Sequence, residues 1–283
     1  RLQDARVPPP LPDAPEVRSD LLDYAVEIDW FNKQLGRMIE MLERSGELDN
    51  TFIAVTGDNG LPFPRCKANL YEWGTHVPLA IRWGKLKGGR TVEDFVSLAD
   101  LAPTFMEATG LKPAAGMTGR SLMNVLQSGK SGWVDPQRQS VLVGRERHTP
   151  AQPDSPAGYP TRAIRTRDFL FVRNFKPERF PAGNDPVYRD IDNGPTKTFM
   201  LEHRNDERVA NLFELGFGKR PAEELYDLKK DPGELHNLAN DPAYAEMRKK
   251  LSSELDRQLK TWQDPRALGK GDEFDTYEYY GKK

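Results

Sequence analysis

Three side chains with the chemistry to hold a metal ion and an anion closely follow one expected strand. The run TFIAVT from Thr51 is rich in Thr, Phe, Ile and Val and predicts a buried strand that ends at Gly57. Asp58 and Asn59 come directly after it, and Lys67 follows a Pro-Phe-Pro turn. Because ligands bind beyond the carboxyl ends of the strands in an open α/β sheet, this position favours a binding site.

The residue types at this position suit a hard cation and a negatively charged ligand. Asp58 and Asn59 offer oxygen ligands of the kind that Ca²⁺ or Mg²⁺ prefers, and no thiolate or imidazole stands beside them to favour zinc. Lys67 could bring a compact positive charge to an anion bound at that metal. The alternative is an Asp-Asn-Gly turn with a solvated lysine, because turns use these residues freely. The spacing alone leaves both interpretations open.

The charge balance excludes a broad electrostatic surface for polyanions. Among 283 residues, Lys and Arg number 41 and Asp and Glu number 43, which gives a formal net charge of -2. Such a balance provides no basic surface for nucleic acid or for an anionic membrane. We therefore expect neither as a partner, and we expect anion recognition to depend on a few placed cations.

The single cysteine, Cys66, excludes an internal disulfide and a cysteine-based metal site. This usage fits a cytoplasmic protein and equally a periplasmic one that does not rely on disulfides. No apolar run approaches the roughly 18 residues of a membrane span.

A long amphipathic helix is expected before the strand. Asp20 is the expected N-cap, after a proline-rich extended segment over residues 1–18, and Gly46 is the expected end. The helix followed by the strand predicts one α/β unit of a parallel sheet. Its apolar positions recur at steps of three and four residues: Leu21, Ala25, Ile28, Phe31, Leu35, Met38, Ile39 and Leu42.

The composition changes near residue 145, where a proline-rich loop begins. Before it, residues 77–83 and 140–144 predict further strands. After it, short strands alternating with turns predict a small antiparallel sheet, and residues 242–262 predict a closing amphipathic helix. We expect an α/β portion over residues 1–145 and a small α+β subdomain over residues 146–283.

Three motifs resemble the sulfatases of the alkaline phosphatase superfamily. They are DNTFIAVTGDNG with CKANLYEWGTHVP, SLADLAPTFMEATG with GRSLMNVL, and EELYDLKKDPGELHNLA. They occur in family order and cover most of the chain from Tyr24 to about Asp264. The stretches DNGLPFP and RAIRTRDFLFVRNF most resemble the heparan N-sulfatase (sulfamidase) branch.

The resemblance implies a fold and a chemistry. The fold is the C-terminal part of an alkaline-phosphatase-like parallel-sheet sandwich, with a small antiparallel sheet and a packed helix after it. The chemistry is Ca²⁺-dependent hydrolysis of sulfate esters or sulfamates of glycans, with a formylglycine hydrate as nucleophile. By match to the family motif, Asp58 and Asn59 would be metal ligands, and Lys67 would contact the sulfate and the leaving-group oxygen.

The sequence departs from the family pattern in one respect. The family's nucleophile motif, Cys/Ser-x-Pro-x-Arg, and its early pair of metal-binding aspartates are not found, and Cys66 lies in a different context. We therefore expect a C-terminal part that is inactive without its missing N-terminal part. The expected partners are that part and a sulfated sugar, and the expected location of the enzyme is periplasmic or secreted.

Three further residues are candidate substrate contacts. His76 follows the Glu-x-Gly turn and could reach a sugar or a sulfate, although a loop histidine is more often only solvated. Arg147 and His148 follow the strand at residues 140–144, at the expected ligand-binding end of the sheet, where contact with an anionic sugar is one of two open interpretations.

The neighbours of Lys67 have simpler expected roles. Arg65 is expected to be solvated, with assistance in anion binding as the alternative. Tyr71 and Glu72 are expected to be structural and to fix the loop that aims Lys67.

Two other functions compete with sulfate hydrolysis. One is a phosphodiesterase or phosphatase of the same superfamily with two zinc ions, which the absence of His near Asp58 disfavours. The other is a non-catalytic glycan-binding relic of a sulfatase.

Overall fold

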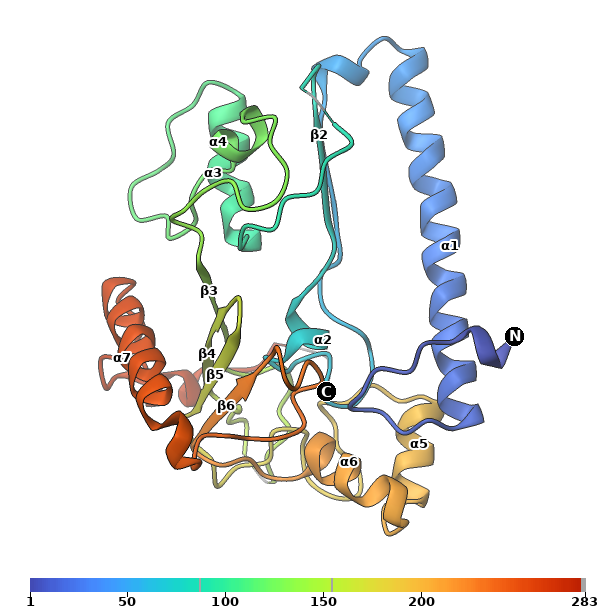
Figure 1. The fold of residues 1–283 in the computed structure, drawn as a ribbon, viewed down its shortest axis with the longest axis vertical. Coiled ribbons are helices and arrows are strands. Elements are labelled where there is room, and N and C mark those ends of the chain that lie inside the picture. The colour runs from blue at the N-terminus through green and yellow to red at the C-terminus, as the bar shows by residue number, and fades with distance from the viewer. Residues whose placement is uncertain (87, 154, 281–283) are drawn as a thin grey trace. The chain divides into compact units, whose positions relative to one another are not determined.

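The computed structural model describes residues 1–86, 88–153 and 155–280 (Figure 1). The chain forms two compact units. The first comprises Arg1–Ala25, Asp58–Val77 and Leu142–Lys283, and the second comprises Val26–Gly57 and Pro78–Val141. The expected division after residue 145 stays a prediction. No described helix combines the length and the apolar character that crossing a membrane requires.

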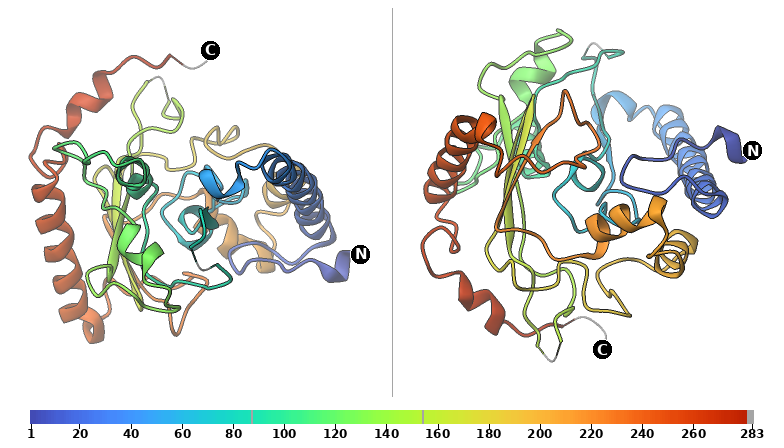
Figure 2. Two further views of the ribbon diagram at one scale, coloured as in Figure 1. Left: turned by 90° about the horizontal axis from the view of Figure 1, so that it is seen from above. Right: turned by 60° about the horizontal axis from the view of Figure 1, so that its bottom comes forward.

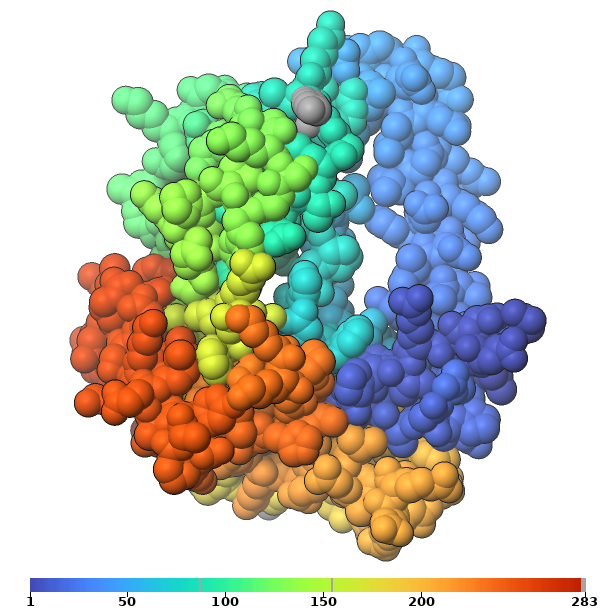
Figure 3. Space-filling model, in the orientation of Figure 1, coloured from blue at the N-terminus to red at the C-terminus, as the bar shows by residue number. Residues whose placement is uncertain are grey.

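A four-stranded sheet is the framework of the first unit. Its strands, in spatial order, are β3 (Ser140–Arg145), β4 (Thr161–Thr166), β5 (Phe169–Asn174) and β6 (Glu223–Asp227). The pairs β4/β5 and β5/β6 are antiparallel. Helix α7 (Ala245–Thr261) packs against this sheet, and its atoms form the outer surface on that side in Figure 3. The predicted antiparallel sheet with a packed helix is therefore confirmed.

Alternation along the strands gives this sheet two buried faces. Ile164, Phe171 and Leu225 pack with the leucines of α7. The side chains next to them along the strands form the second face, among them Leu170 and Tyr226. Tyr226 packs there with Tyr71 from the segment 58–77. Figure 2 shows α7 on one side of the sheet and the segment with helix α2 (Glu72–Thr75) on the other. The sheet therefore supports the segment that contains the candidate site.

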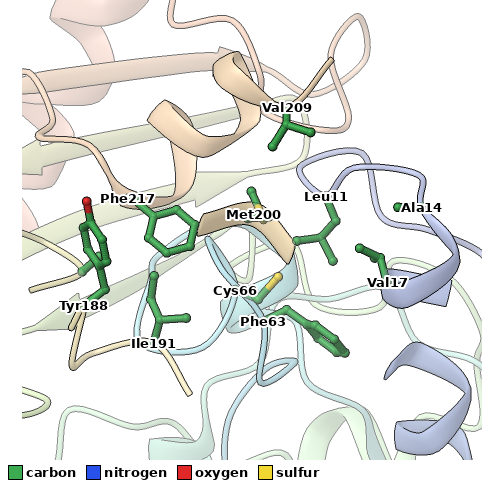
Figure 4. Packing of buried hydrophobic residues seen from close by; sticks show 11 residues of the cluster. Leu11, Ala14, Val17, Phe63, Cys66, Tyr188, Ile191, Met200, Val209 and Phe217 are labelled. Atoms are coloured by element: carbon green, nitrogen blue, oxygen red, sulfur yellow. The ribbon is translucent and has the colours of Figure 1, made fainter. Parts of the chain in front are cut away.

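A second core of the first unit lies beneath two helices, α5 (Pro195–Glu202) and α6 (Glu207–Phe217). Phe63 and Cys66 from the segment 58–77 enter this core, as does Ile191 (Figure 4). Cys66 is fully buried, and burial raises the pKa of its thiol to about 12. The thiol therefore stays protonated and fills space in this core.

The expected N-cap of the long helix is wrong. Helix α1 (Pro15–Arg44) begins at Pro15, where the missing N–H and the fixed φ of proline suit the first position. Asp20 lies inside the helix, and its Oδ2 instead accepts hydrogen bonds from the Thr196 backbone N–H at 2.9 Å and from Thr196 Oγ1 at 2.6 Å. Asp20 thus caps α5, which begins at Pro195, from a distant part of the chain.

The spacing of apolar residues predicted helix α1 correctly, but most of these residues are not buried. Val17 is the buried residue of α1 within the part of the chain that the structure describes. Ile28, Phe31 and Met38 are 49%, 50% and 61% exposed. Three apolar positions of the predicted helix therefore face solvent.

The second unit contains strands β1 (Phe52–Thr56) and β2 (Leu79–Trp83), which pair directly and antiparallel, with Phe52 opposite Trp83. The neighbouring strands of a parallel sheet are not found beside β1 among the described residues. Helices α3 (Leu101–Ala108) and α4 (Met123–Gln127) also belong to this unit, as do residues 26–44 of α1. Pro103 lies in the first turn of α3, where proline is tolerated.

Candidate functional site

The site loop, residues 58–77, is folded back on itself through two glycines. A Cβ at Gly60 would lie 2.2 Å from the carbonyl oxygen of Trp73, and one at Gly74 would lie 2.3 Å from that of Cys66. The Leu61 N–H donates to the Trp73 carbonyl at 3.1 Å. The backbone can therefore approach this closely only because Gly60 and Gly74 have no side chain.

The backbone on both sides of Lys67 adopts a left-handed conformation. Arg65 has φ 62° and Ala68 has φ 60°. Such conformations cost about 1–3 kcal/mol for a residue other than glycine and persist only where surrounding contacts enforce them. Here Arg145 donates to the Ala68 carbonyl, and the Asn69 side chain donates to the Lys67 carbonyl at 2.9 Å. The position of Lys67 is thus fixed by its neighbours.

Arg65 is buried, so the expectation of a solvated side chain is wrong. It is 2% exposed, and its guanidinium lies 3.8 Å over the ring of Tyr71. It donates to the Leu215 carbonyl at 3.0 Å and to Tyr226 Oη at 3.2 Å, and it also donates to the Glu234 carbonyl. These acceptors lie far along the chain, and no local pattern announces them.

Tyr71 and Glu72 fix the loop, as predicted. Tyr71 is buried, and its hydroxyl donates to Glu224 Oε2 at 2.7 Å. Glu72 Oε1 lies 2.5 Å from His76 Nδ1, and Arg165 donates to Glu72 Oε2 at 3.2 Å. These contacts join the loop to strands β4 and β6.

Lys67 forms an ion pair that the sequence did not predict. Its Nζ donates to Asp192 Oδ2 at 2.8 Å, and the two side chains are 27% and 40% exposed. The ammonium is therefore partly desolvated, yet a ligand can reach it.

Asp58 and Asn59 are exposed on the same loop. Asn59 Nδ2 donates to the Gly60 carbonyl at 3.2 Å, and none of the described residues donates to a side-chain oxygen of either residue. Their donor set of one carboxylate and one amide oxygen fits a hard cation. Within residues 1–86, 88–153 and 155–280, no group of three or more His, Cys, Asp or Glu side chains could hold a metal ion.

Sequence comparison identifies the family. The model described as Sulfatase matches residues 3–111. An ulvan-active sulfatase from Formosa agariphila is 31% identical over 262 residues, which cover 89% of this chain and 40% of the relative. N-sulphoglucosamine sulphohydrolase from Homo sapiens is 29% identical over 273 residues, with coverage of 89% and 50%. This chain belongs to the sulfatase family. It spans about half the length of these curated relatives or less.

Solved structures confirm the predicted fold class of this sulfatase chain. A structure described as BT4656 in complex with its substrate D-glucosamine-2-N,6-O-disulfate is 24% identical and has a TM-score of 0.60, with coverage of 88% of this chain and 42% of that chain. The phosphonate monoester hydrolase of Agrobacterium radiobacter gives the same four values. At this identity the likeness concerns the fold alone.

The remaining candidate contacts of the sulfatase chain already have protein partners. His76 is exposed, and its hydrogen bond with Glu72 raises the pKa of the imidazole. Arg147 donates to the carbonyl oxygens of Pro156 and Tyr277, each at 2.8 Å, and so fixes the C-terminal segment. The role of His76 and Arg147 as substrate contacts stays a prediction.

His148 and Lys67 both contact the short segment that contains Asp190 and Asp192. His148 Nδ1 lies 3.3 Å from Asp190 Oδ1, and Asp192, two residues further along, pairs with Lys67. The role of His148 as a substrate contact also stays a prediction. Sequence reasoning missed Asp192, because nothing in its local sequence distinguishes it from the other aspartates of this polar stretch.

Proposed function

We propose that the complete enzyme that contains this chain hydrolyses sulfate esters or N-sulfate groups of glycans. The observation that carries the proposal is the site loop, which presents an unengaged Asp-Asn oxygen pair and a fixed lysine ammonium in a chain of the sulfatase family. The Asp58 and Asn59 oxygens suit a hard metal ion, and the Lys67 ammonium supplies one positive charge. Together they suit the binding of a singly charged sulfo group.

Asp58 and Asn59 would hold the metal ion, with Ca²⁺ as the proposed ion and Mg²⁺ as an alternative. When bound, the ion would act as a Lewis acid towards the sulfo oxygens. Asp58 contributes a charge and Asn59 a neutral oxygen, so the pair binds a cation without strong mutual repulsion. The remaining ligands would come from the N-terminal part of the enzyme.

Lys67 would stabilise the charge that develops during the reaction. Its ammonium donates hydrogen bonds towards the sulfo group and the leaving oxygen or nitrogen, and the surrounding contacts hold it in place beforehand. The nucleophile, a formylglycine hydrate, would belong to the N-terminal part. Cys66 does not serve, because its thiol is buried and protonated. We therefore propose that the chain by itself is inactive.

The substrate class we propose is a sulfated glycan, with sulfated glucosamine as the first choice. Support comes from the named activity of the human relative and from the ligand in the BT4656 structure. The ulvan-active relative supports a wider range of sulfated polysaccharides. Because polymeric glycans of this kind lie outside the cytoplasm, we propose a periplasmic or secreted enzyme.

A second candidate function is hydrolysis of phosphonate or phosphate esters. The equal structural similarity to a phosphonate monoester hydrolase favours it. A third is a glycan-binding relic without catalysis, which the intact Asp58, Asn59 and Lys67 disfavour for this part of the site.

The three functions separate in one assay on the complete enzyme with Ca²⁺ present. Sulfate release is measured from glucosamine N-sulfate and glucosamine 6-sulfate. Release of the free phosphonic acid is measured from a phosphonate monoester. We expect release from at least one sulfated sugar at a rate far above that from the phosphonate. A faster phosphonate reaction would favour the second function, and binding of the sugars without any release would leave the relic.

A further inference from the structure

We propose that Asp192 is a specificity-determining residue of the Lys67 site, which selects singly charged sulfo groups against doubly charged anions. The proposal rests on the proposed function in one respect, since it takes Lys67 as the anion contact. It adds a second charged residue to that contact and assigns it a consequence for substrate and product.

The first observation is the geometry of the pair. Asp192 Oδ2 lies 2.8 Å from Lys67 Nζ, so the cation that meets the anion already has a carboxylate beside it. Both side chains are partly exposed, at 27% for Lys67 and 40% for Asp192, so a ligand can approach the pair. The pair together has no net charge, in contrast to a lone lysine.

The second observation is that the Asp192 segment is held in place by a buried cation. Lys197 is 5% exposed, and its ammonium donates to the carbonyl oxygens of Val187 at 2.9 Å, Tyr188 at 3.1 Å and Ile191 at 2.9 Å. It also donates to Asn193 Oδ1 at 3.1 Å. Burying an ammonium is costly unless its donors are satisfied, and these four acceptors wrap residues 187–193 around it.

The third observation is that the two charged residues rest on one core. Ile191 and Cys66 belong to the same buried cluster, and each precedes one member of the pair, Asp192 and Lys67 (Figure 4). The carboxylate therefore cannot easily move away when an anion reaches Lys67.

A fixed carboxylate beside the anion site penalises negative charge in proportion to the charge of the ligand. A sulfate ester or a sulfamate has one negative charge. A phosphate monoester above pH 7 has about two, and so does inorganic sulfate, the product of the proposed reaction. Asp192 thus disfavours phosphate monoesters as substrates and favours release of the product.

Equilibrium binding to the complete enzyme at pH 8 tests the proposal. The probes are methyl sulfate, with one charge, and inorganic sulfate, with two, measured by titration calorimetry. The Asp192→Asn variant keeps an oxygen that can accept from Lys67 but removes the charge. We expect it to bind methyl sulfate about threefold and inorganic sulfate about tenfold more tightly, because the interaction energy scales with ligand charge.

Two variants serve as controls. Asp192→Glu keeps the charge and should leave the ratio of the two affinities near that of the wild type. Asp185→Asn removes the same charge at an exposed aspartate that pairs with Arg204 at 3.1 Å, and it should change neither affinity. Equal factors for the two probes in Asp192→Asn, or no change, would overturn the proposal.

The result is separable from the outcome for hydrolysis. If the wild-type enzyme releases no sulfate but Asp192→Asn shows the unequal gains, the catalytic proposal fails and the role of Asp192 stands. If sulfate is released and the gains are equal, only the role of Asp192 fails.

Discussion

At the scale of single residues, the site depends on a few charges whose surroundings are very different. Lys67 is a partly exposed ammonium paired with Asp192, whereas Arg65, two residues away, is a buried structural cation. Arg65 has a left-handed backbone, with φ 62°, and its side chain lies in the core, whereas that of Lys67 reaches Asp192. Neighbouring cations in one motif therefore have separate roles.

Replacement of Lys67 by alanine should damage catalysis and spare the fold. In the complete enzyme, we expect kcat/KM for a sulfated glucosamine to fall about 100- to 1000-fold, the loss typical of one charge-stabilising donor. Stability should change by about 1 kcal/mol or less, because a partly exposed ion pair contributes little. Steady-state kinetics and thermal unfolding check both, with Lys229→Ala as the control, an exposed lysine that pairs with Asp168. Unchanged activity in Lys67→Ala would contradict the assigned role.

Glu234 should make stability fall as pH rises. Burial raises the pKa of its carboxyl from 4.5 to about 7. The folded state thus holds the proton more tightly than the unfolded state, so the contribution is complete below pH 4.5 and is lost as pH rises through 7. Urea unfolding at pH 5 and pH 8 should show this decline in the wild type and a smaller one in Glu234→Gln.

His76 needs a separate variant in that experiment. Its pKa is also raised, so it too contributes stability at low pH that is lost as pH rises. His76→Gln removes that part and should leave the Glu234 decline visible. An identical pH profile in the wild type and Glu234→Gln would show that Glu234 is not protonated in the fold.

At the scale of elements, the site loop is supported by a sheet that lies far along the chain. Tyr71 binds Glu224 in β6, and Glu72 binds Arg165 in β4, while α7 buries the opposite face of the same strands. The C-terminal sheet thus supports and positions the loop that contains Lys67.

The stability of this loop should depend on the absence of a side chain at Gly60. A Cβ there would lie 2.2 Å from the Trp73 carbonyl oxygen, which is backbone and cannot yield. We expect Gly60→Ala to lower the free energy of unfolding by about 1–3 kcal/mol, the usual cost of overpacking. The matched variant Ala68→Gly relieves a left-handed conformation and should be neutral or stabilising. Chemical denaturation compares the two, and a tolerated Gly60→Ala would show that the loop is less tightly closed.

At the scale of the whole molecule, the exposed apolar face of α1 bears on the expected partner. Ile28, Phe31 and Met38 are 49% to 61% exposed, and Trp30 is 61% exposed. Large exposed apolar patches are rare on monomeric soluble proteins and mark interaction surfaces. The expected cover is the N-terminal part of the same enzyme.

The chain expressed alone should therefore associate or aggregate. We expect it to bind a hydrophobic dye and to elute as multimers in size-exclusion chromatography, and we expect co-expression with the N-terminal part to abolish both effects. Paired substitutions such as Phe31→Ser with Met38→Ser should reduce dye binding of the isolated chain. A monomeric sample that unfolds cooperatively would contradict this prediction.

Local sequence patterns were enough to predict the local features of this protein. A run rich in Thr, Phe, Ile and Val predicted β1, and short strands alternating with turns predicted the antiparallel sheet. Apolar residues at helical spacing predicted α1 and α7, and turn chemistry predicted the loop that contains Asp58, Asn59 and Lys67. The motifs around that loop identified the family. These features depend on residues that are close in the chain, and a pattern can therefore show them.

The folded structure was needed to show which distant groups meet. It placed Asp192 on Lys67, buried Arg65 against Glu234 and Tyr226, and assigned Asp20 to α5 instead of α1. Each of these contacts joins residues separated by more than 100 positions. Such contacts depend on how separate elements pack, and an aspartate or an arginine has the same local sequence whether it faces solvent or a partner.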